Sequence, residues 1–417
     1  MSTYFAEGLP YMLVRILSSV YFTDLGVRER YLGYLNFLGL PWNAKFLWAP
    51  FVDRLGTKRA WMVGLQLGLG VLTAAVALLA FLGQGAANVS PYLTVTSGLF
   101  VAMAFVSATN DVAVDGHYLE ALSNPRDQAA FSGYRVLAYR ISMVFARSGL
   151  VALAAWVSAG AIGARTSTGW SVAFSAGAAT LVALATFHAF GLPRVEPRAE
   201  ATTPPSYVRA FLSYLDQERV GVVLAFVALY KLGDEILFSM ATPFLMRELG
   251  VSKEQFAWVG GLVGALATVL GAMWGGRWIS KVGLAKAIWP MTLFMNVNIW
   301  AYVWLAWAKP QASTSYGIFS IALIHGYEQF AAGLGSAVLL VFLLGTCKPD
   351  FKAAHYAIGS ALMSLGASLI GGFGGRIVES VGYLNLFILA FVASLPSMLL
   401  LPWLPLKAEP VSAASAG

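Results

Sequence analysis

The sequence predicts an all-α integral membrane protein with about twelve transmembrane helices. Of its 417 residues, 58% are hydrophobic and only 11% are charged, whereas a soluble globular protein carries about 25% charged residues. The mean hydropathy of +0.70 leaves few polar side chains to cover a water-exposed surface. Apolar runs of about 20 residues recur along the chain, and a helix of that length crosses a hydrocarbon core of about 30 Å.

The expected helices are the apolar runs that glycine, proline and charged residues separate. A polar segment, 193–219, divides these runs six from six. Its start is rich in Pro, Glu and Thr, and its end, from Tyr207, predicts a short amphipathic helix. We therefore expect an N-terminal six-helix bundle over 1–192, a cytoplasmic linker over 193–219 and a C-terminal six-helix bundle over 220–417. The runs cover residues 5–25, 32–52, 61–83, 92–115, 132–157, 170–192, 220–246, 256–279, 286–307, 314–346, 354–374 and 384–405.

Lysine and arginine set the expected orientation, since cytoplasmic loops carry an excess of both. With the N-terminus inside, the inner loops hold about twice as many Lys and Arg residues as the outer loops, so both termini are predicted to be cytoplasmic. The formal net charge of +7 reflects this bias and does not indicate a nucleic-acid partner. The single cysteine, Cys347, excludes an intrachain disulfide and a multi-cysteine metal site. We expect neither a metal nor a cofactor.

A short charged pattern occurs twice, slightly more than half a chain apart. DRLGTKR follows the second run and GGRWISKVGLAKA follows the eighth, and in each a basic residue precedes a turn glycine by two positions. Parallel repeats of this kind build transporters in which two similar bundles face a site near the middle of the membrane. The predicted cytoplasmic gate contains Asp53, Arg54, Gly56, Lys58, Arg59 and Gly283, together with Asp115 near the cytoplasmic end of the fourth run.

Charged residues inside the apolar runs are informative, because each costs about 2.5–3.5 kcal/mol at the centre of a membrane helix. Arg140 and Arg147 are seven residues apart, so on an α-helix they differ by about 20° in direction and share a face. Arginine presents a rigid fork to carboxylate or phosphate groups, so the two residues predict a site for an anionic substrate. The alternative is that each arginine pairs with an acid on a neighbouring helix.

Carboxylates inside the runs are candidates for carrying a proton during transport. Lys231 can pair with an acid three or four residues later, which would account for one of the two carboxylates at those positions and leave the other. An acid of the fourth run can instead pair with an arginine on a neighbouring helix. The proton-coupling candidates are Asp111, Asp234, Glu235 and Glu328.

Other polar and aromatic residues complete the expected substrate site. Lys45 either snorkels to the interface or points into the cavity, where it adds to a positive lining or pairs with Asp111 or Glu235. Tyrosines near the charged faces can stack on a sugar or another ring. With the two arginines of the fifth run, the expected substrate-binding residues are Arg15, Lys45, Asn110, Tyr230, Lys231 and Tyr327.

Five segments of the chain form a recognisable series: EGLPYMLV with YFTDLGV, LPWNAKFLWAPFVDR, SATNDVAVDGHYLEAL, GYRVLAYR and YKLGDEILFSMATPFLMRELG. In this order they resemble the AmpG-type permeases of the peptide/acetyl-CoA transporter group, within the major facilitator superfamily. Together with the twelve-helix plan, the resemblance covers nearly the whole chain.

The resemblance implies the major facilitator fold of two pseudo-symmetric six-helix bundles and a proton-driven secondary transporter of the bacterial inner membrane. The best-known members import anhydromuropeptides, the sugar–peptide products of cell-wall turnover. Polar positions of the family pattern match Lys45, Asp111, Asp115, Arg135, Lys231 and Asp234. The sequence departs from the pattern at Arg15, Arg140, Arg147 and Glu235.

The leading hypothesis is a monomeric, proton-coupled importer of a bulky anionic solute that works by alternating access, with an anhydromuropeptide as the first candidate. The alternative keeps the fold and changes the substrate to a siderophore, an acyl-CoA or another organic anion, with or without proton coupling. An enzyme is not expected, because the sequence contains no H-E-x-x-H pair, no phosphate-binding glycine loop and no serine nucleophile motif.

Overall fold

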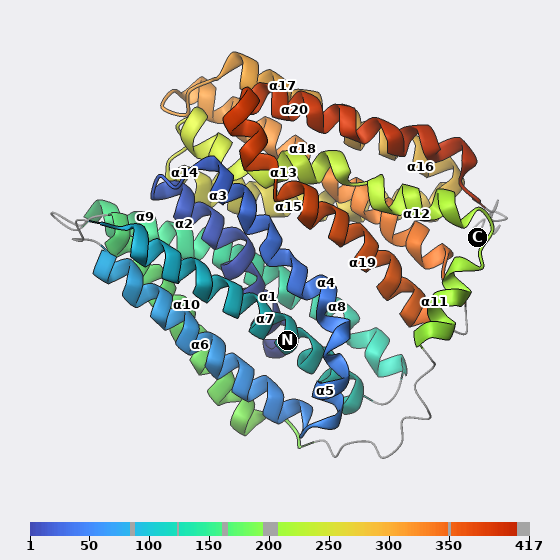
Figure 1. Cartoon of the computed structure of the whole chain (residues 1–417), viewed down its shortest axis with the longest axis horizontal. Helices are drawn as coiled ribbons and strands as arrows, with labels where there is room; N and C mark the ends of the chain where they lie inside the picture. Colours follow the sequence, from blue (N-terminus) through green and yellow to red (C-terminus); the bar gives the residue numbers. More distant parts are fainter. Residues whose placement is uncertain (84–87, 123–124, 161–165, 195–206, 349–351, 407–417) are drawn as a thin grey trace, which may run out of the picture. The chain divides into compact units, whose positions relative to one another are not determined.

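The computed structural model describes residues 1–83, 88–122, 125–160, 166–194, 207–348 and 352–406. Every regular element in these ranges is helical (Figure 1). Among them, seven continuous helical stretches are long and apolar enough to cross a membrane. The prediction of an all-α membrane protein is confirmed.

The elements before the central polar segment account for the first six apolar runs. Helices η1 and η5 are π-helical turns, whereas η2 and η3 are 3₁₀ turns. The elements are α1 (Ser2–Met12), η1 (Leu13–Leu17), α2 (Ser18–Asp24), α3 (Glu29–Tyr34), η2 (Leu35–Gly39), α4 (Leu40–Ala44), η3 (Lys45–Leu47), α5 (Ala49–Arg54), α6 (Lys58–Leu82), α7 (Ser90–Ala121), α8 (Pro125–Val144), η5 (Phe145–Leu150), α9 (Val151–Gly160) and α10 (Thr166–Gly191).

The elements after the polar segment begin with the short helix that the sequence predicts from Tyr207, and then account for the last six runs. They are α11 (Tyr207–Leu215), α12 (Val220–Leu229), α13 (Leu232–Pro243), η6 (Phe244–Glu248), α14 (Lys253–Phe256), η7 (Ala257–Val263), α15 (Gly264–Val282), α16 (Leu284–Val297), α17 (Ile299–Ala308), α18 (Ser315–Gly345), α19 (Lys352–Gly371), α20 (Gly374–Leu400) and η9 (Leu401–Trp403).

Several predicted runs are interrupted helices, and the breaks have local causes. The run 32–52 is divided into short pieces, and α4 and α5 each carry a proline, Pro41 and Pro50, at the start. Proline has no amide hydrogen and is favoured in the first turn of a helix, so a new piece begins there. The run 220–246 breaks at Lys231, whose backbone is not helical.

The described residues pack into two compact units. Unit 1 comprises Met1–Arg28, Leu35–Glu200 and Val251–Leu262, and unit 2 comprises Glu29–Tyr34, Ala201–Gly250 and Val263–Gly417. Unit 1 thus includes the segment 251–262 from the C-terminal half of the sequence, and unit 2 includes the segment 29–34 from the N-terminal half.

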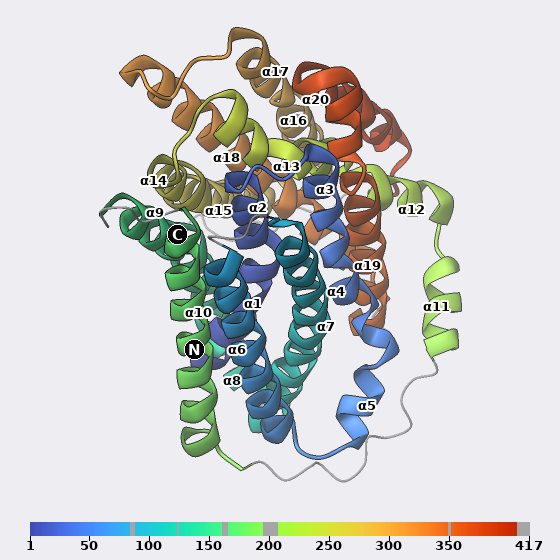
Figure 2. The same ribbon diagram turned by 60° about the vertical axis from the view of Figure 1, so that its left-hand side comes forward.

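Within unit 1, α6 lies along α10, as both views show (Figures 1 and 2). Buried aromatic rings fill the interior beside them, with Tyr21 of α2 in edge contact with Trp170 and Phe174 of α10. An ion pair joins Lys253 to Asp24 at 3.0 Å, and the indole of Trp170 donates to the same carboxylate at 2.6 Å. These contacts hold the segment 251–262 to the rest of unit 1.

Within unit 2, α3 packs against α20. Arg247 pairs with Glu29 at 2.8 Å, and Arg30 pairs with Glu379 at 2.6 Å. Gly375 lies against the backbone of Glu29, where a β-carbon would collide. The close backbone approach brings both ion pairs within reach and fixes α3 in unit 2.

Helices α15 and α18 of unit 2 pack closely through small residues. A β-carbon added at Gly271 would collide with the carbonyl oxygen of Phe330, and one added at Gly333 would collide with that of Thr268. Membrane helices lack a hydrophobic driving force between them, so close van der Waals contact through small residues is a main source of association.

We expect Gly271→Ala to lower the thermal stability of the purified protein, because the added methyl overpacks the contact with α18 at a cost of about 1–3 kcal/mol. Gly276→Ala, five residues later on the same helix, is the matched control because Gly276 faces open space. Both variants gain about 1 kcal/mol of helix propensity. Thermal unfolding in detergent that ranks Gly271→Ala level with Gly276→Ala would contradict the packing account.

Candidate functional site

The centre of the candidate site in unit 1 is an ion pair between Lys45 of η3 and Asp111 of α7. The ammonium donates to the Asp111 carboxylate at 2.7 Å, and the two side chains are 31% and 14% exposed. This is one of the arrangements that the sequence allows for Lys45. Each side chain depends on the other, because removing one partner leaves an uncompensated charge among apolar helices.

Glu7 of α1 adds a second carboxyl group to this pair. It lies close enough to Asp111 to hydrogen-bond to it and to interact with Lys45, and its Oε2 atom is buried without a hydrogen-bond partner among the described residues. A hydrogen bond between two carboxyl groups requires a proton on one of them. The three side chains therefore lie together in one compact group.

Asp115, one turn beyond Asp111 on α7, forms a second ion pair in the same unit. The Arg135 guanidinium donates to Asp115 at 2.9 Å, and the Tyr4 hydroxyl donates to the same oxygen at 2.9 Å. The guanidinium also lies 4.3 Å from the ring centres of both Tyr4 and Tyr118. Hydrogen bonds and cation–π contacts together fix Arg135 in place.

Asn110 lies on a different side of α7, in a fully buried hydrogen-bond network. Its amide donates to the carbonyl of Ala6 at 3.2 Å and accepts from Gln66 at 3.3 Å. Gln66 in turn lies 2.7 Å from the ring of His188. These bonds tie α7 to α1, α6 and α10, and a contact of Asn110 with substrate stays a prediction.

The arginines expected to bind substrate lie in different surroundings. Arg15 donates to the carbonyls of Leu35 at 3.3 Å and Asn36 at 2.7 Å, which satisfies carbonyls of η2. A π-helical turn begins between Arg140 and Arg147, so the 20° offset of an ideal α-helix does not apply to them. Both remain candidates for an anion.

Unit 2 holds a comparable group of charges around the break before α13. Lys231 donates to the hydroxyl of Ser336 on α18 at 2.9 Å and has no ion-pair partner among the described residues. Asp234 and Glu328 are each 1% exposed, and neither carboxyl group has a hydrogen-bond partner there. Glu328 is close enough to interact electrostatically with both Asp234 and Lys231.

The remaining predicted residues of unit 2 do not share one face. Tyr230 is fully buried against Phe226, with ring centres 5.0 Å apart. Tyr327 is 41% exposed and packs edge-on against Phe294. Glu235 is half-buried next to Asp234. Only Asp234, Glu328 and Lys231 are brought together closely.

The residues of the predicted gate form local contacts. Lys58 is buried and donates to the carbonyl of Val52 at 2.8 Å, and Arg59 donates to the carbonyls of His188 and Ala189. Arg54 is exposed, and the Asp53 side chain lies outside the described part of the chain.

The two turn glycines of the repeated pattern both have a positive φ angle. Gly56 has φ 73° and Gly283 has φ 79°. Side chains disfavour this left-handed region, which is open to glycine. A gating function for these residues stays a prediction.

Sequence reasoning missed Glu7 and the Gln66–His188 contact. Glu7 lies within the predicted run 5–25, so the insertion penalty that selects Asp111 applies to it equally. Gln66 and His188 lack such a signal, because their pairing depends on how α6 and α10 face each other. The described residues contain no group of three or more His, Cys, Asp or Glu side chains that could hold a metal ion.

Comparison with known structures identifies the fold. A bacterial homologue of the human lysosomal transporter Spinster, solved in an inward-facing and unoccupied conformation, superposes with a TM-score of 0.72 at 16% identity, covering 96% of this chain and 94% of the other. The chain therefore has the major facilitator fold that the sequence predicts.

Comparison with curated relatives narrows the class. The anhydromuropeptide permease of Escherichia coli is 26% identical over 95% of this chain and 77% of its own length, and an uncharacterised Haemophilus influenzae protein is 28% identical over 98% and 94%. A family model described as acetyl-coenzyme A transporter 1 matches residues 4–153. The chain is thus similar over nearly its whole length to relatives named anhydromuropeptide permease and putative transporter AmpG 4, which confirms the resemblance seen in the sequence.

A double-mutant cycle should find Lys45 and Asp111 energetically coupled. We expect Lys45→Met and Asp111→Asn each to destabilise the protein and the double variant to lose less than the sum, with a coupling of about 1–3 kcal/mol. The control is the pair of Lys309 and Glu248, which is equally short at 2.7 Å but 56% and 34% exposed. Its coupling should stay under about 1 kcal/mol. Strictly additive unfolding free energies at Lys45 and Asp111 would contradict the geometry.

Proposed function

We propose that the protein is a proton-coupled importer of a bulky anionic solute, with an anhydromuropeptide as the first candidate. It works as a monomer by alternating access, with both termini in the cytoplasm. The homology to an anhydromuropeptide permease supports the substrate. The acidic group around Lys45 supports the coupling to protons.

The charge balance in unit 1 is the observation that carries the proposal. Three carboxyl groups, those of Glu7, Asp111 and Asp115, interact with one another. Among the described residues they bond to two cations, Lys45 and Arg135. An excess negative charge among apolar helices is costly unless it is neutralised. One proton on Glu7, in a hydrogen bond to Asp111, neutralises it and leaves Asp111 ionised beside Lys45.

Competition for Lys45 links the proton to the substrate. When a carboxylate or phosphate of the substrate binds the ammonium of Lys45, Asp111 loses its cation and then needs a proton. Substrate binding and protonation therefore favour each other, and by linkage the effect is reciprocal. In a transporter with this property, an inward proton gradient drives the anion into the cell together with the proton.

Other cations add positive charge for a large anion. Arg140 and Arg147 lie in unit 1 with Lys45. Unit 2 has a charged group of its own, in which Lys231 is the cation and the buried carboxyl groups of Asp234 and Glu328 are a second place where a proton can bind. Alternating access exposes these residues first to the outside and then to the cytoplasm, with Gly56 and Gly283 at the expected gate.

A second candidate function is the transport of an acyl-CoA or a siderophore on the same fold. The family model of an acetyl-coenzyme A transporter matches residues 4–153, and this range includes Lys45, Asp111 and Arg140. Such substrates are also bulky anions, so the same cations would serve them.

Neutralising Asp111 should separate binding from coupling. We expect Asp111→Asn to bind substrate and to exchange it across the membrane, yet to lose accumulation driven by an imposed proton gradient, because asparagine mimics the protonated acid. Lys45→Met should weaken binding about 10- to 100-fold, as expected for a lost charged hydrogen bond. The control is Asp216→Asn, whose carboxylate is 90% exposed and should leave both properties unchanged.

Uptake into proteoliposomes measures both properties. Normal gradient-driven accumulation in Asp111→Asn and Glu7→Gln would refute the proposed coupling site. If Glu328→Gln or Asp234→Asn alone then lost accumulation, the proton would be carried in unit 2.

Competition experiments should identify the substrate class. We expect an unlabelled anhydromuropeptide to block uptake of the labelled compound, while acetyl-CoA and a ferric siderophore do not. Inhibition by acetyl-CoA with no effect of the muropeptide would transfer the proposal to the second candidate.

A further inference from the structure

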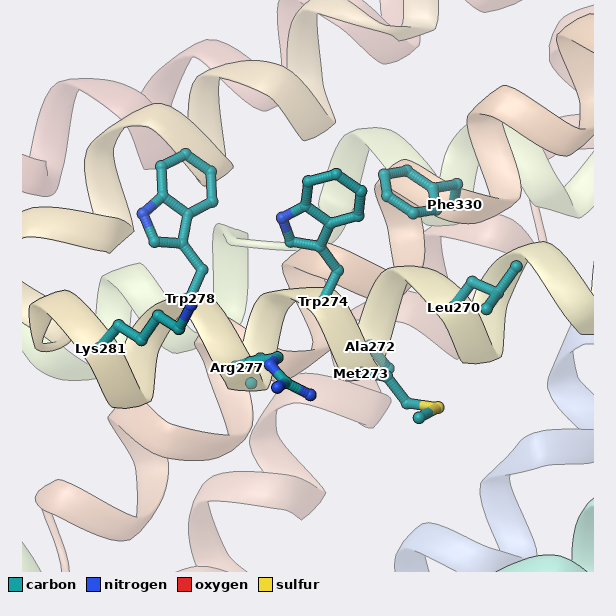
Figure 3. Close-up of a pocket in the computed structure, with 9 residues that line it drawn as sticks. Leu270, Ala272, Met273, Trp274, Arg277, Trp278, Lys281 and Phe330 are labelled. Carbon is teal, nitrogen blue, oxygen red and sulfur yellow. The ribbon is translucent and has the colours of Figure 1, made fainter. Parts of the chain in front are cut away.

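The outer face of α15 in unit 2 carries a groove of about 1040 Å³ (Figure 3). Two rows of side chains, each spaced about one helical turn, line it along one face of the helix. The apolar row is Leu270, Trp274 and Trp278, and the second row is Met273, Arg277 and Lys281. Phe330 of α18 forms its edge beside Trp274.

The close packing of α15 on α18 shapes this groove. Gly271 and Gly275 are buried against α18, which brings the Phe330 ring to 6.0 Å from the Trp274 ring in an edge-on contact. The wall residues remain uncovered: Leu270 is 58%, Met273 67% and Trp274 63% exposed. An apolar surface this open must face lipid tails or a partner.

One end of the groove is positively charged. Arg277 and Lys281 are exposed, and neither bonds to an acid within the part of the chain that the structure describes. By contrast, the exposed Lys309 pairs with Glu248, and Arg30 pairs with Glu379. Arg277 and Lys281 are therefore available to bind an anion from outside the chain.

The length of the groove matches one leaflet of a bilayer. The helical stretch Lys253–Val282 has 30 residues, which at 1.5 Å per residue is about 45 Å, enough to include both headgroup regions. Lys281 lies at its end and thus at headgroup depth. Leu270 lies about 16 Å deeper, close to half of the hydrocarbon thickness.

We propose that this groove is a binding site for an acidic phospholipid of the bilayer. The headgroup phosphate lies between Arg277 and Lys281, and an acyl chain follows Leu270, Met273 and Trp274 to the Phe330 ring. Trp278, about 4.5 Å along the helix from Lys281, lies at the depth of the interface between headgroups and tails, where tryptophan is enriched. A zwitterionic headgroup fits less well, because its ammonium adds a further positive charge beside the two cations.

Native mass spectrometry of the purified protein with added phosphatidylglycerol or phosphatidylcholine tests the proposal. We expect the wild type to bind phosphatidylglycerol in preference, and Arg277→Gln with Lys281→Gln to bind it about 30-fold more weakly, since each cation near the surface contributes about fivefold. Lys286→Gln is the matched control, because Lys286 is exposed beside the same turn but does not line the groove.

The experiment separates headgroup, tail and other occupants. Trp274→Ala should weaken phosphatidylglycerol binding while the preference over phosphatidylcholine remains, and Arg277→Lys with Lys281→Arg should bind as the wild type does. Equal binding of both lipids, or an equal loss in Lys286→Gln, would overturn the proposal. The proposal would also fail if glycerol phosphate displaced the lipid, because that result indicates a site for a soluble anion. It would fail as well if the groove substitutions caused a dimer to dissociate, because that result indicates an interface between two copies. These outcomes are independent of transport, so the proposed function stands or falls separately.

Discussion

The burial of charge among apolar helices is the constraint on which the rest of the structure depends. Asp111 can lie within α7 because Lys45 reaches it at 2.7 Å, and Lys45 can do so because η3 interrupts the second apolar run at that point. Glu7 joins the pair from α1. Helices η3, α7 and α1 thus bring a cation and two carboxyl groups together. Our proposal needs at least these groups to link the binding of an anion to that of a proton.

The two units meet this constraint in different ways. In unit 1 two of the three carboxyl groups have a short contact with a cation, Asp111 with Lys45 and Asp115 with Arg135. In unit 2 the lysine donates to a hydroxyl, and Asp234 and Glu328 interact with it only at longer range. A partner already bonded to its acid can be displaced by a competing anion, and this favours unit 1 as the place where substrate and proton are linked.

The helices and part of the candidate site could be predicted from the sequence. Twelve apolar runs could be placed because burial in lipid requires long apolar stretches, and Lys45 and Asp111 stood out because charge is rare there. The breaks at Lys231 and within η5 could not be foreseen, since they depend on packing between helices. For the same reason no spacing rule reveals that the partners of Arg15 are backbone carbonyls. The shared face of Arg140 and Arg147 was predicted for an ideal α-helix, which the π-helical turn interrupts.

Proton uptake on substrate binding tests the central claim most directly. Calorimetric titration of an anhydromuropeptide into the purified protein, repeated in buffers of different ionisation enthalpy, measures the protons exchanged with solvent. Because the substrate removes Lys45 from Asp111, the account predicts an uptake of about one proton per substrate bound, and none in Asp111→Asn. Binding of the same compound by the wild type without any proton uptake would contradict it.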